Sequence, residues 1–345
     1  MAKEKVVKEE GKSKLQTALD KLNKDYGIGT VLSLNDKMNT SYNVISSGSV
    51  GMDYITLGVG GWVKGKMYEL MGWDGSGKST ICGHASSECQ KVGGKVLYID
   101  GEHALDITYF QSLGVDTSKM LISQPSCGEE GFNIAMEMAK TGEIDLIIID
   151  SDSSLIPKKV LDGEVGDSSI GKKAMLNSNA YPKLKSVISE NNVCLIITSQ
   201  YRQKIGVMFG DPTTTQGGMA LRFYADCRIE VSKSLVKEED VVIANLTKVK
   251  SIKNKMSPPF RKSEFNVKYG VGIDKITEII ELASDLEIIK KWGKSVTFKD
   301  VKYDVIEFNS MLENNQEFFD ELKKSVIDKI KNVEIKIEED VTSED

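Results

Sequence analysis

Short apolar runs alternate with helical patterns along the central part of the chain. The runs lie at 67–71, 95–100, 145–150 and 193–198, and the third contains Leu146-Ile147-Ile148-Ile149 without a polar residue. Continuous runs of this length are typical of strands that are buried on both faces. The pattern therefore predicts an α/β fold whose mainly parallel sheet is covered by helices.

The segments on either side of this central part have different patterns. Residues 13–25 place Leu15, Leu19 and Leu22 at the spacing of a short amphipathic helix that begins at Ser13. After Arg228 the chain becomes β-rich, which we expect to extend the sheet, and from 273 to 330 helical periodicity returns in a small α/β module. We expect an N-terminal helix and linker at 1–40, a core at 41–272, a C-terminal domain at 273–335 and an acidic tail at 336–345.

Composition places the chain among globular proteins. Of its 345 residues 40% are hydrophobic and 28% charged, which allows a large core and excludes wholesale disorder. No apolar run reaches the roughly 18 residues of a membrane span, and the polar N-terminus lacks the apolar segment of a secretory signal. The five cysteines are far apart, and the two histidines suggest no zinc spacing. We expect a cytoplasmic protein without membrane contact.

The net charge of −6 argues against a protein that is basic overall, but the charge is unevenly distributed. Residues 241–263 carry six basic side chains and no acidic one, whereas five carboxylates fall within 338–345. This asymmetry is more informative than the net value, because a local basic segment can still meet an anionic partner.

A phosphate-binding motif follows the first apolar run. Residues 72–79, Gly-Trp-Asp-Gly-Ser-Gly-Lys-Ser, have two glycines separated by four residues and followed by Lys and Ser, between a predicted strand and a predicted helix. In such loops backbone N–H groups face the phosphates, which predicts that Lys78 bridges the β- and γ-phosphates and that Ser79 ligates Mg²⁺. A glycine-rich turn without a ligand is the alternative, and this context disfavours it.

Three further side chains come at or just after the ends of predicted strands. Asp150 fits a carboxylate that holds Mg²⁺ through water, and Glu102 is a candidate to orient and deprotonate the attacking water. Gln200 could sense the γ-phosphate. A solvated loop carboxylate is the less favoured alternative for Glu102, and the sequence does not separate the role of Gln200 from that of an ordinary strand-end amide. The residues predict a Mg²⁺-dependent nucleoside triphosphatase, with ATP favoured because the guanine-reading Asn-Lys-x-Asp pattern does not occur.

Several longer motifs resemble those of bacterial RecA recombinases, in matching order over about 13–335. They are Ile99-Asp100-Gly101-Glu102-His103-Ala104-Leu105-Asp106, Ser123-Gln124-Pro125, Gly163-Glu164-Val165-Gly166-Asp167-Ser168, Lys204-Ile205-Gly206-Val207-Met208-Phe209-Gly210 and Lys253-Asn254-Lys255. The resemblance implies a P-loop NTPase core of the RecA type. It also implies a DNA-dependent ATPase that forms a helical filament on single-stranded DNA and catalyses homologous pairing and strand exchange in recombinational repair.

The resemblance also implies roles for individual residues. The catalytic set would be Glu102, Lys78, Gln200, Lys253 and Lys255, with both of the last two lysines reaching the γ-phosphate of a neighbouring subunit. The nucleotide set would be Gly72, Trp73, Asp74, Gly75, Ser76, Gly77, Lys78, Ser79, Thr80, Asp106 and Tyr109, with adenine at the last two. Ser79 and Asp150 would hold the metal. Without the Lys-Asn-Lys match, both lysines would be read as a solvated strand face.

Two glycine-bearing segments, 162–171 and 201–218, resemble the DNA-binding loops of the family. The DNA-binding set would be Ile170, Ser178, Arg202, Ile205, Gly217, Gly218 and Met219. Without the match of 206–210, mobile surface loops would be the default interpretation. The chain departs from the family pattern at Met175 and Pro182, which stand where arginines are common, and at Gln216 and Met219. These departures suggest a distant bacterial or a bacteriophage-type member.

The flanking segments acquire roles by the same resemblance. The N-terminal helix would be a polymerisation element that packs on an adjacent core, although an intramolecular lid fits its periodicity equally well. The C-terminal domain would gather duplex DNA, and the acidic tail would screen that surface or merely aid solubility. The partners implied are single- and double-stranded DNA, further copies of the chain, a self-cleaving repressor, and single-strand-binding or loader proteins.

Two other functions are possible on the same core. A ring-forming helicase-like motor would unwind duplex DNA, but the two loop motifs and the lack of a helicase-type N-terminal domain disfavour it. A filament that coats DNA and uses ATP only as a clamp would not need Glu102.

Overall fold

The computed structural model describes residues 13–26, 31, 41–164, 169, 171–203, 213–215, 217–238 and 241–342. The chain divides into two compact units, Met1–Tyr42 and Asn43–Asp345. In the first unit, α1 (Lys14–Tyr26) begins after Ser13, whose hydroxyl oxygen accepts a hydrogen bond from the backbone N–H of Gln16 at 3.1 Å. The expected helix and its cap are confirmed, and Leu15 on this helix is 70% exposed.

The second unit is built on one large mixed sheet, and its strand order is β12-β11-β10-β9-β3-β7-β6-β4-β5. The strands from β9 to β5 run parallel, whereas β10, β11 and β12 are antiparallel additions. Their bounds are β3 (Met67–Gly72), β4 (Val96–Asp100), β5 (Leu121–Ser123), β6 (Leu146–Asp150), β7 (Cys194–Gln203), β9 (Cys227–Glu238), β10 (Val241–Asn254), β11 (Lys262–Lys268) and β12 (Gly272–Ile273). The predicted α/β class and the extension of the sheet after Arg228 are confirmed.

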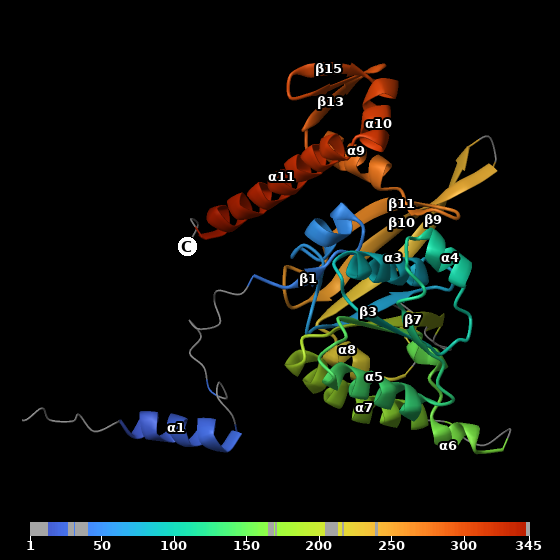
Figure 1. Cartoon of the computed structure of the whole chain (residues 1–345), viewed down its shortest axis with the longest axis vertical. Coiled ribbons are helices and arrows are strands. Elements are labelled where there is room, and N and C mark those ends of the chain that lie inside the picture. Colours follow the sequence, from blue (N-terminus) through green and yellow to red (C-terminus); the bar gives the residue numbers. More distant parts are fainter. Residues whose placement is uncertain are drawn as a thin grey trace, which may run out of the picture. The chain divides into compact units, whose positions relative to one another are not determined.

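Helices cover both faces of the parallel strands (Figure 1). On one face lie α3 (Lys78–Lys91) and α4 (Ile107–Ser112), and on the other α5 (Gly128–Lys140) and α7 (Lys172–Glu190). Because successive strand side chains point to opposite faces, Ile148 packs in the α3 cluster while Ile147 and Ile149 pack in the α5–α7 cluster. The uninterrupted apolar run of β6 is thus explained by burial on both sides.

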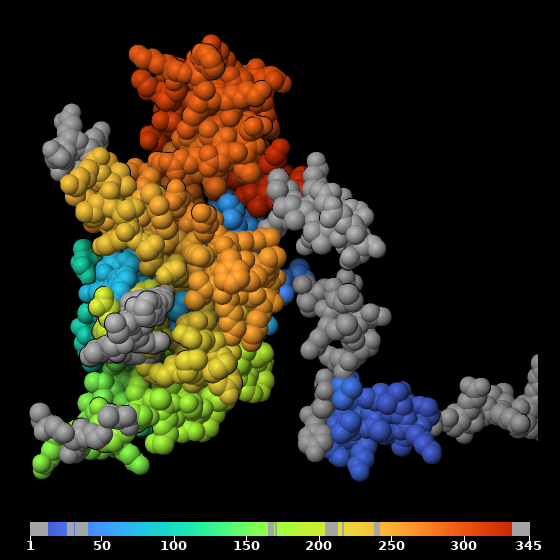
Figure 2. Space-filling model, turned by 180° about the vertical axis from the view of Figure 1, so that it is seen from behind, coloured from blue at the N-terminus to red at the C-terminus, as the bar shows by residue number. Residues whose placement is uncertain are grey.

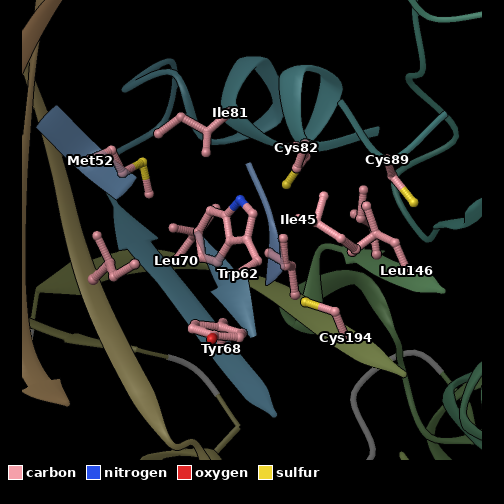
Figure 3. Packing of buried hydrophobic residues seen from close by; sticks show 14 of the residues in the cluster. Ile45, Met52, Trp62, Tyr68, Leu70, Ile81, Cys82, Cys89, Leu146 and Cys194 are labelled. Carbon is pink, nitrogen blue, oxygen red and sulfur yellow. The ribbon is translucent and has the colours of Figure 1, made fainter. Parts of the chain in front are cut away.

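Figure 3 shows the core beneath α3, where Ile81 and Cys82 lie over Trp62 and Leu70. This packing fixes α3 against β3, and the turn between the two is the phosphate-binding motif. Smaller elements complete the unit: β1 (Val44–Ile45), η1 (Met52–Thr56), β2 (Trp62–Val63), η2 (Asp152–Ser154), α6 (Lys158–Leu161), β8 (Thr213–Thr215) and α8 (Ala220–Tyr224).

The C-terminal module forms a lobe with a core of its own at one end of the second unit (Figure 2). It comprises α9 (Lys275–Asp285), the antiparallel strands β13 (Ile289–Trp292), β14 (Ser295–Phe298) and β15 (Val301–Asp304), α10 (Val305–Asn314) and α11 (Gln316–Thr342). Phe298, Phe308 and Phe318 meet edge to face at its centre. The last helix continues into the segment expected as an acidic tail, of which 343–345 lie outside the described residues.

Three strands, β7, β9 and β10, are longer than their sequence patterns indicate. β7 continues past Thr198 to Gln203, because Tyr201, Arg202 and Gln203 pair with β8. β9 and β10 form a long antiparallel hairpin, whose outer part mixes polar residues such as Lys233 and Ser234 with apolar ones such as Leu235 and Ile243. Across the part of the chain that the structure describes, no helix has the length and apolar character needed to span a bilayer.

Candidate active site

The carboxyl ends of the central parallel strands meet at one edge of the sheet, and they bring the predicted residues together. Gly72 at the end of β3 lies beside Gln200 of β7, and Asp100 at the end of β4 lies beside Asp150 of β6. A cleft opens at this edge. It is lined by the motif residues Asp74, Gly75, Ser76, Gly77, Lys78, Ser79 and Thr80, and by Glu102, Asp150 and Gln200.

The phosphate-binding loop is closely packed against the neighbouring strand β9. A Cβ on Gly72 would lie 2.3 Å from the carbonyl oxygen of Val231, so this position accepts only glycine without a backbone shift. Gly77 has a φ of +99°, a conformation that glycine adopts without strain, and α3 starts at the next residue. The first turn of α3 therefore opens into the cleft with its backbone N–H groups, which favours an anion.

Lys78 has the features of a cation that binds an anionic ligand. It is 7% exposed, and its Nζ donates to the carbonyl oxygens of Gly72 at 3.2 Å and Trp73 at 2.9 Å. Burial lowers the pKa of Lys78, and nearby Asp150 opposes that shift. No carboxylate among the described residues forms an ion pair with it, and the buried Ser76 Oγ likewise has no described hydrogen-bond partner. These groups fit a phosphate.

Asp150 and Ser79, the predicted metal residues, are in direct contact. The Ser79 hydroxyl donates to Asp150 Oδ2 at 2.7 Å, and the same carboxylate accepts from the Tyr98 hydroxyl at 2.6 Å and from the Thr198 hydroxyl at 2.5 Å. A hydroxyl and a carboxylate are hard oxygen donors of the kind that Mg²⁺ prefers. The donor set therefore fits a magnesium ion bound beside the phosphates.

Glu102 is exposed but is held by two donors. Its Oε1 accepts hydrogen bonds from the Ser151 hydroxyl at 2.7 Å and from Gln200 Nε2 at 2.9 Å. The amide oxygen of Gln200 accepts in turn from Arg202 Nη2 at 2.6 Å. A continuous hydrogen-bonded chain thus runs from the strand end of β6 through Glu102 and Gln200 to Arg202. The Gln200 amide is therefore not isolated, and Glu102, although exposed, has a fixed orientation.

The two residues expected at adenine stand next to the phosphate-binding loop. Asp106 caps α4 by accepting from the N–H of Tyr109 at 2.9 Å, and the Tyr109 hydroxyl lies 2.9 Å from Thr80 Oγ1. Trp73, in the loop itself, is half exposed and contacts Tyr201 edge to face, with ring centroids 5.9 Å apart.

Lys253 and Lys255 do not line the cleft of their own subunit. Lys253 Nζ donates to the carbonyl oxygens of Arg222 at 2.8 Å and Phe223 at 2.9 Å, near the C-terminal end of α8. Lys255 Nζ lies 3.6 Å from Asp226 Oδ1. Both side chains are therefore held away from the phosphate site of the same chain.

The predicted DNA-binding residues are described in part. Ser178 on α7, Arg202 on β7 and Met219 before α8 are exposed. Gly217 and Gly218 have φ angles of +93° and +83°. Ile170, Ile205 and Gln216 lie outside the described residues.

The geometry agrees with comparisons to known proteins. A model of the RecA N-terminal domain matches residues 13–274. The chain belongs to the RecA family. Relatives named Protein RecA include that of Cytophaga hutchinsonii, 48% identical over 84% of this chain and 81% of the relative, and that of Porphyromonas gingivalis, 41% identical over 96% and 99%. The protein of Clostridioides difficile is 43% identical over 84% and 83%.

Membership of the RecA family establishes the broad function as that of a recombinase in DNA recombination and repair. It implies a DNA-dependent ATPase that binds nucleotide together with a metal ion and forms filaments. The helicase-like motor and the DNA-coating clamp are not favoured. The expected resemblance to bacterial RecA recombinases is confirmed.

Sequence reasoning missed several residues that shape this RecA-type site. Tyr98 and Thr198 orient Asp150, and Ser151 holds Glu102. Asp100 accepts from Gln124 Nε2 at 3.0 Å and from two backbone N–H groups of the loop that carries Glu102. The only available signal was a polar side chain inside or directly after an apolar strand.

Proposed function

We propose that this chain hydrolyses ATP within a helical filament on single-stranded DNA and uses that filament for homologous pairing and strand exchange. The observation that carries the proposal is the chain of hydrogen bonds from Ser151 through Glu102 and Gln200 to Arg202. It connects the residue best placed to activate water with the start of a segment expected to bind DNA. Such a connection gives a physical reason for hydrolysis to depend on DNA.

The hydrolytic step uses the residues of the cleft. Water attacks the γ-phosphorus, the bond from that phosphorus to the bridging oxygen breaks, and ADP leaves. Glu102 takes the proton of the water, and the donors Ser151 and Gln200 hold its carboxylate in one orientation. Lys78 stabilises the charge on the phosphate oxygens. Mg²⁺, held by Ser79 and Asp150, would neutralise the β- and γ-phosphate oxygens.

Adenine would lie against Tyr109, with Asp106 beside it. Because Thr80 links Tyr109 to the helix that starts at Lys78, base and phosphate contacts are made by one rigid unit. Lys253 and Lys255 would act in trans, on the γ-phosphate bound by a neighbouring subunit. Their position outside their own cleft supports this proposal, since cations supplied by a neighbour make hydrolysis depend on assembly.

Two exposed apolar features support assembly into a filament. Leu15 on α1 is 70% exposed, so the helix presents an apolar side chain that a neighbouring core could cover. At the edge of the large sheet, β5 exposes Leu121 by 43% and Ile122 by 49%. An open strand edge with apolar side chains is suited to pairing with another chain. We place the polymerisation contact at these two features.

DNA would be held between the two segments 162–171 and 201–218, and the C-terminal domain at 273–335 would gather duplex DNA. Because Met175 and Pro182 are uncharged, we expect a lower salt dependence, by about 0.7 in slope for each missing contact to single-stranded DNA. A self-cleaving repressor and single-strand-binding or loader proteins are further proposed partners, in the cytoplasm.

The substitution Glu102→Gln tests the hydrolytic part of the proposal. It keeps the side-chain shape but removes the proton acceptor, so turnover should fall by about 100-fold or more while ATP and DNA binding persist. Glu137→Gln, at an exposed position of α5, is the matched control and should behave as wild type. Unchanged turnover in the Glu102 variant would remove this residue from the mechanism.

A further inference from the structure

A buried polar cluster lies directly behind the active site and takes no part in the chemistry described above. We call Asp152, Lys173, Asn177 and Tyr181 the Asp152 cluster. Asp152 is 1% exposed, and Asn177 and Tyr181 are fully buried against the apolar side chains between α7 and the sheet. Buried polar groups are costly unless their hydrogen bonds are made, so a cluster of this kind calls for an explanation.

The carboxylate of Asp152 is the centre of the cluster. Both of its oxygens lie 3.2 Å from Asn177 Nδ2, and Oδ1 also accepts from the Tyr181 hydroxyl. Lys173 Nζ lies 3.4 Å from Oδ1 and donates to the backbone carbonyls of Asp152 and Leu155, at 2.5 Å each. The cluster thus fixes both the side chain and the backbone of the residue that follows Asp150 and Ser151.

The cluster also holds the C-terminal ends of both segments proposed to bind DNA. Lys173 and Asn177 lie in the first two turns of α7, which begins directly after segment 162–171. Asn177 Nδ2 donates in addition to the carbonyl oxygen of Gly217 at 3.1 Å, at the end of segment 201–218. A Cβ on Gly217 would lie 2.4 Å from Asn177 Nδ2 and 2.5 Å from Asp152 Oδ2, so this backbone packs directly on the cluster.

We propose that the Asp152 cluster couples the nucleotide cleft to both DNA-facing segments, with Asn177 as its positioning residue. Asp150 accepts a hydrogen bond from Ser79 and Ser151 donates one to Glu102, so a shift of these cleft residues on nucleotide binding would be passed to Asp152, the next residue in the chain. Through Asn177 the same displacement reaches the start of α7 and Gly217. This inference rests on the proposed function. It adds a route to the ends of the segments, separate from the Gln200–Arg202 contact at the start of the second one.

The substitution Asn177→Leu removes the hydrogen bonds to Asp152 and Gly217 at nearly constant volume. The quantity to measure is the ratio of affinities for a fluorescently labelled oligothymidylate with and without a slowly hydrolysed ATP analogue. We expect this ratio to fall by about tenfold, within the usual range for coupling between sites, because the nucleotide no longer positions both segments. The affinity for the analogue without DNA should stay within about twofold of wild type.

Two matched variants separate coupling from mere stability. Tyr181→Phe removes a hydrogen bond to the same carboxylate without touching Gly217, so it should lower the thermal midpoint but keep the wild-type ratio. Asn179→Leu makes the same change as Asn177→Leu at an exposed position of the same helix and should alter neither quantity. A wild-type ratio in Asn177→Leu, or an equal loss in Tyr181→Phe, would overturn the proposal.

Hydrogen exchange on the wild-type protein tests the coupling even if Asn177→Leu does not fold. Adding the ATP analogue without DNA should protect the backbone amides of 172–177 and 217–221 together. Protection of neither segment, or of one alone, would contradict the proposal. Hydrogen exchange is measured without DNA, so its result does not depend on DNA binding. If nucleotide does not change the DNA affinity of the wild-type protein, the proposed function is refuted. The exchange result then still shows whether the cleft and the two segments are coupled.

Discussion

Gln200 Nε2 lies 2.9 Å from Glu102 Oε1 and joins the candidate general base to β7, whose next residues enter the second DNA-facing segment. The amide has two ends, and its oxygen accepts from Arg202. Gln200 thus hydrogen-bonds the candidate general base Glu102 through its nitrogen and the DNA-facing Arg202 through its oxygen. A change at either residue can therefore alter the position of the other. The position of Gln200 beside Gly72 in the sheet places this amide at the cleft.

Replacing Gln200 by Ala should separate hydrolysis from DNA. The variant loses the hydrogen bonds to Glu102 and Arg202 but none to Lys78 or Ser79. We expect the affinity for nucleotide to stay within about threefold of wild type. Most of the stimulation of ATP hydrolysis by DNA should be lost, which corresponds to a coupling energy at the lower end of those found between sites. Steady-state ATPase assays with and without single-stranded DNA measure this. Gln111→Ala, on α4, serves as the control, and full stimulation in the Gln200 variant would refute the link.

The substitution Lys253→Ala should remove DNA-stimulated hydrolysis and leave nucleotide binding intact. The lysine is held at the end of α8 in its own subunit, and we propose that it reaches phosphate only across a filament contact. Lys324→Ala removes an exposed lysine of α11 and is the control for loss of charge alone. Mixing the Lys253 variant with a Glu102→Gln partner provides a second test. If the lysine acts in trans, mixed filaments regain activity at the contacts where an intact lysine faces an intact Glu102.

Thr198→Val should weaken the metal site without removing a ligand. The threonine hydroxyl donates to Asp150 Oδ1 at 2.5 Å, and valine fills nearly the same volume. Loss of a group that orients a metal-binding side chain commonly costs 10- to 100-fold, so the magnesium concentration for half-maximal turnover should rise by about tenfold or more. A magnesium titration of turnover measures this, with Thr141→Val on the surface as control. An unchanged magnesium requirement would show that Asp150 needs no such support.

The stability of the contact between the core and the C-terminal module should decrease as pH rises. Glu278 on α9 accepts from the Ser49 hydroxyl at 2.5 Å and from the N–H of Gly51 at 3.0 Å, and burial raises its pKa to about 7. Burial also raises the pKa of Asp53 to about 7. Because the folded state binds these protons more tightly, their stabilisation is complete below the ordinary carboxyl pKa and is lost as pH rises through 7.

Glu278→Gln checks this pH dependence. Glutamine resembles the protonated carboxyl group, so the variant should lose less stability than wild type between pH 5.5 and 8, by up to roughly 2 kcal/mol. Denaturant unfolding at the two pH values gives the difference. Glu317→Gln, exposed on α11, should retain the wild-type pH dependence. Equal losses in wild type and the Glu278 variant would show that this carboxyl does not titrate on unfolding.

The sequence predicted those parts of the fold that depend on local pattern. The buried strand β6 was evident because burial on both faces requires an unbroken apolar run, and the phosphate-binding turn was evident because its glycines serve a fixed geometry. The β-rich character after Arg228 was also evident, but the full length of the β9–β10 hairpin was not, because polar residues such as Lys233 and Ser234 interrupt the pattern of β9. The extension of β7 depends on pairing with β8, a contact that no local pattern encodes.

In the candidate site, too, some features follow from local sequence pattern and others depend on how the strands pair. Glu102, Asp150 and Gln200 come at or just after the ends of the predicted strands, so a parallel sheet was enough to predict their proximity. Thr198 and Tyr98 face Asp150 only because of the register of β7, β6 and β4, which periodicity does not specify. The Asp152 cluster joins residues that are 21 to 29 positions apart, and the sequence offered no signal for it.

We propose that DNA and a neighbouring subunit together switch on hydrolysis. The measurement that decides this is the steady-state ATPase rate over a range of protein concentrations, with and without single-stranded DNA. We expect little hydrolysis by the protein alone. With DNA, the rate per subunit should rise cooperatively with concentration, because Lys253 and Lys255 complete the cleft of a neighbour. A rate per subunit that is the same with and without DNA, and the same at every concentration, would contradict it.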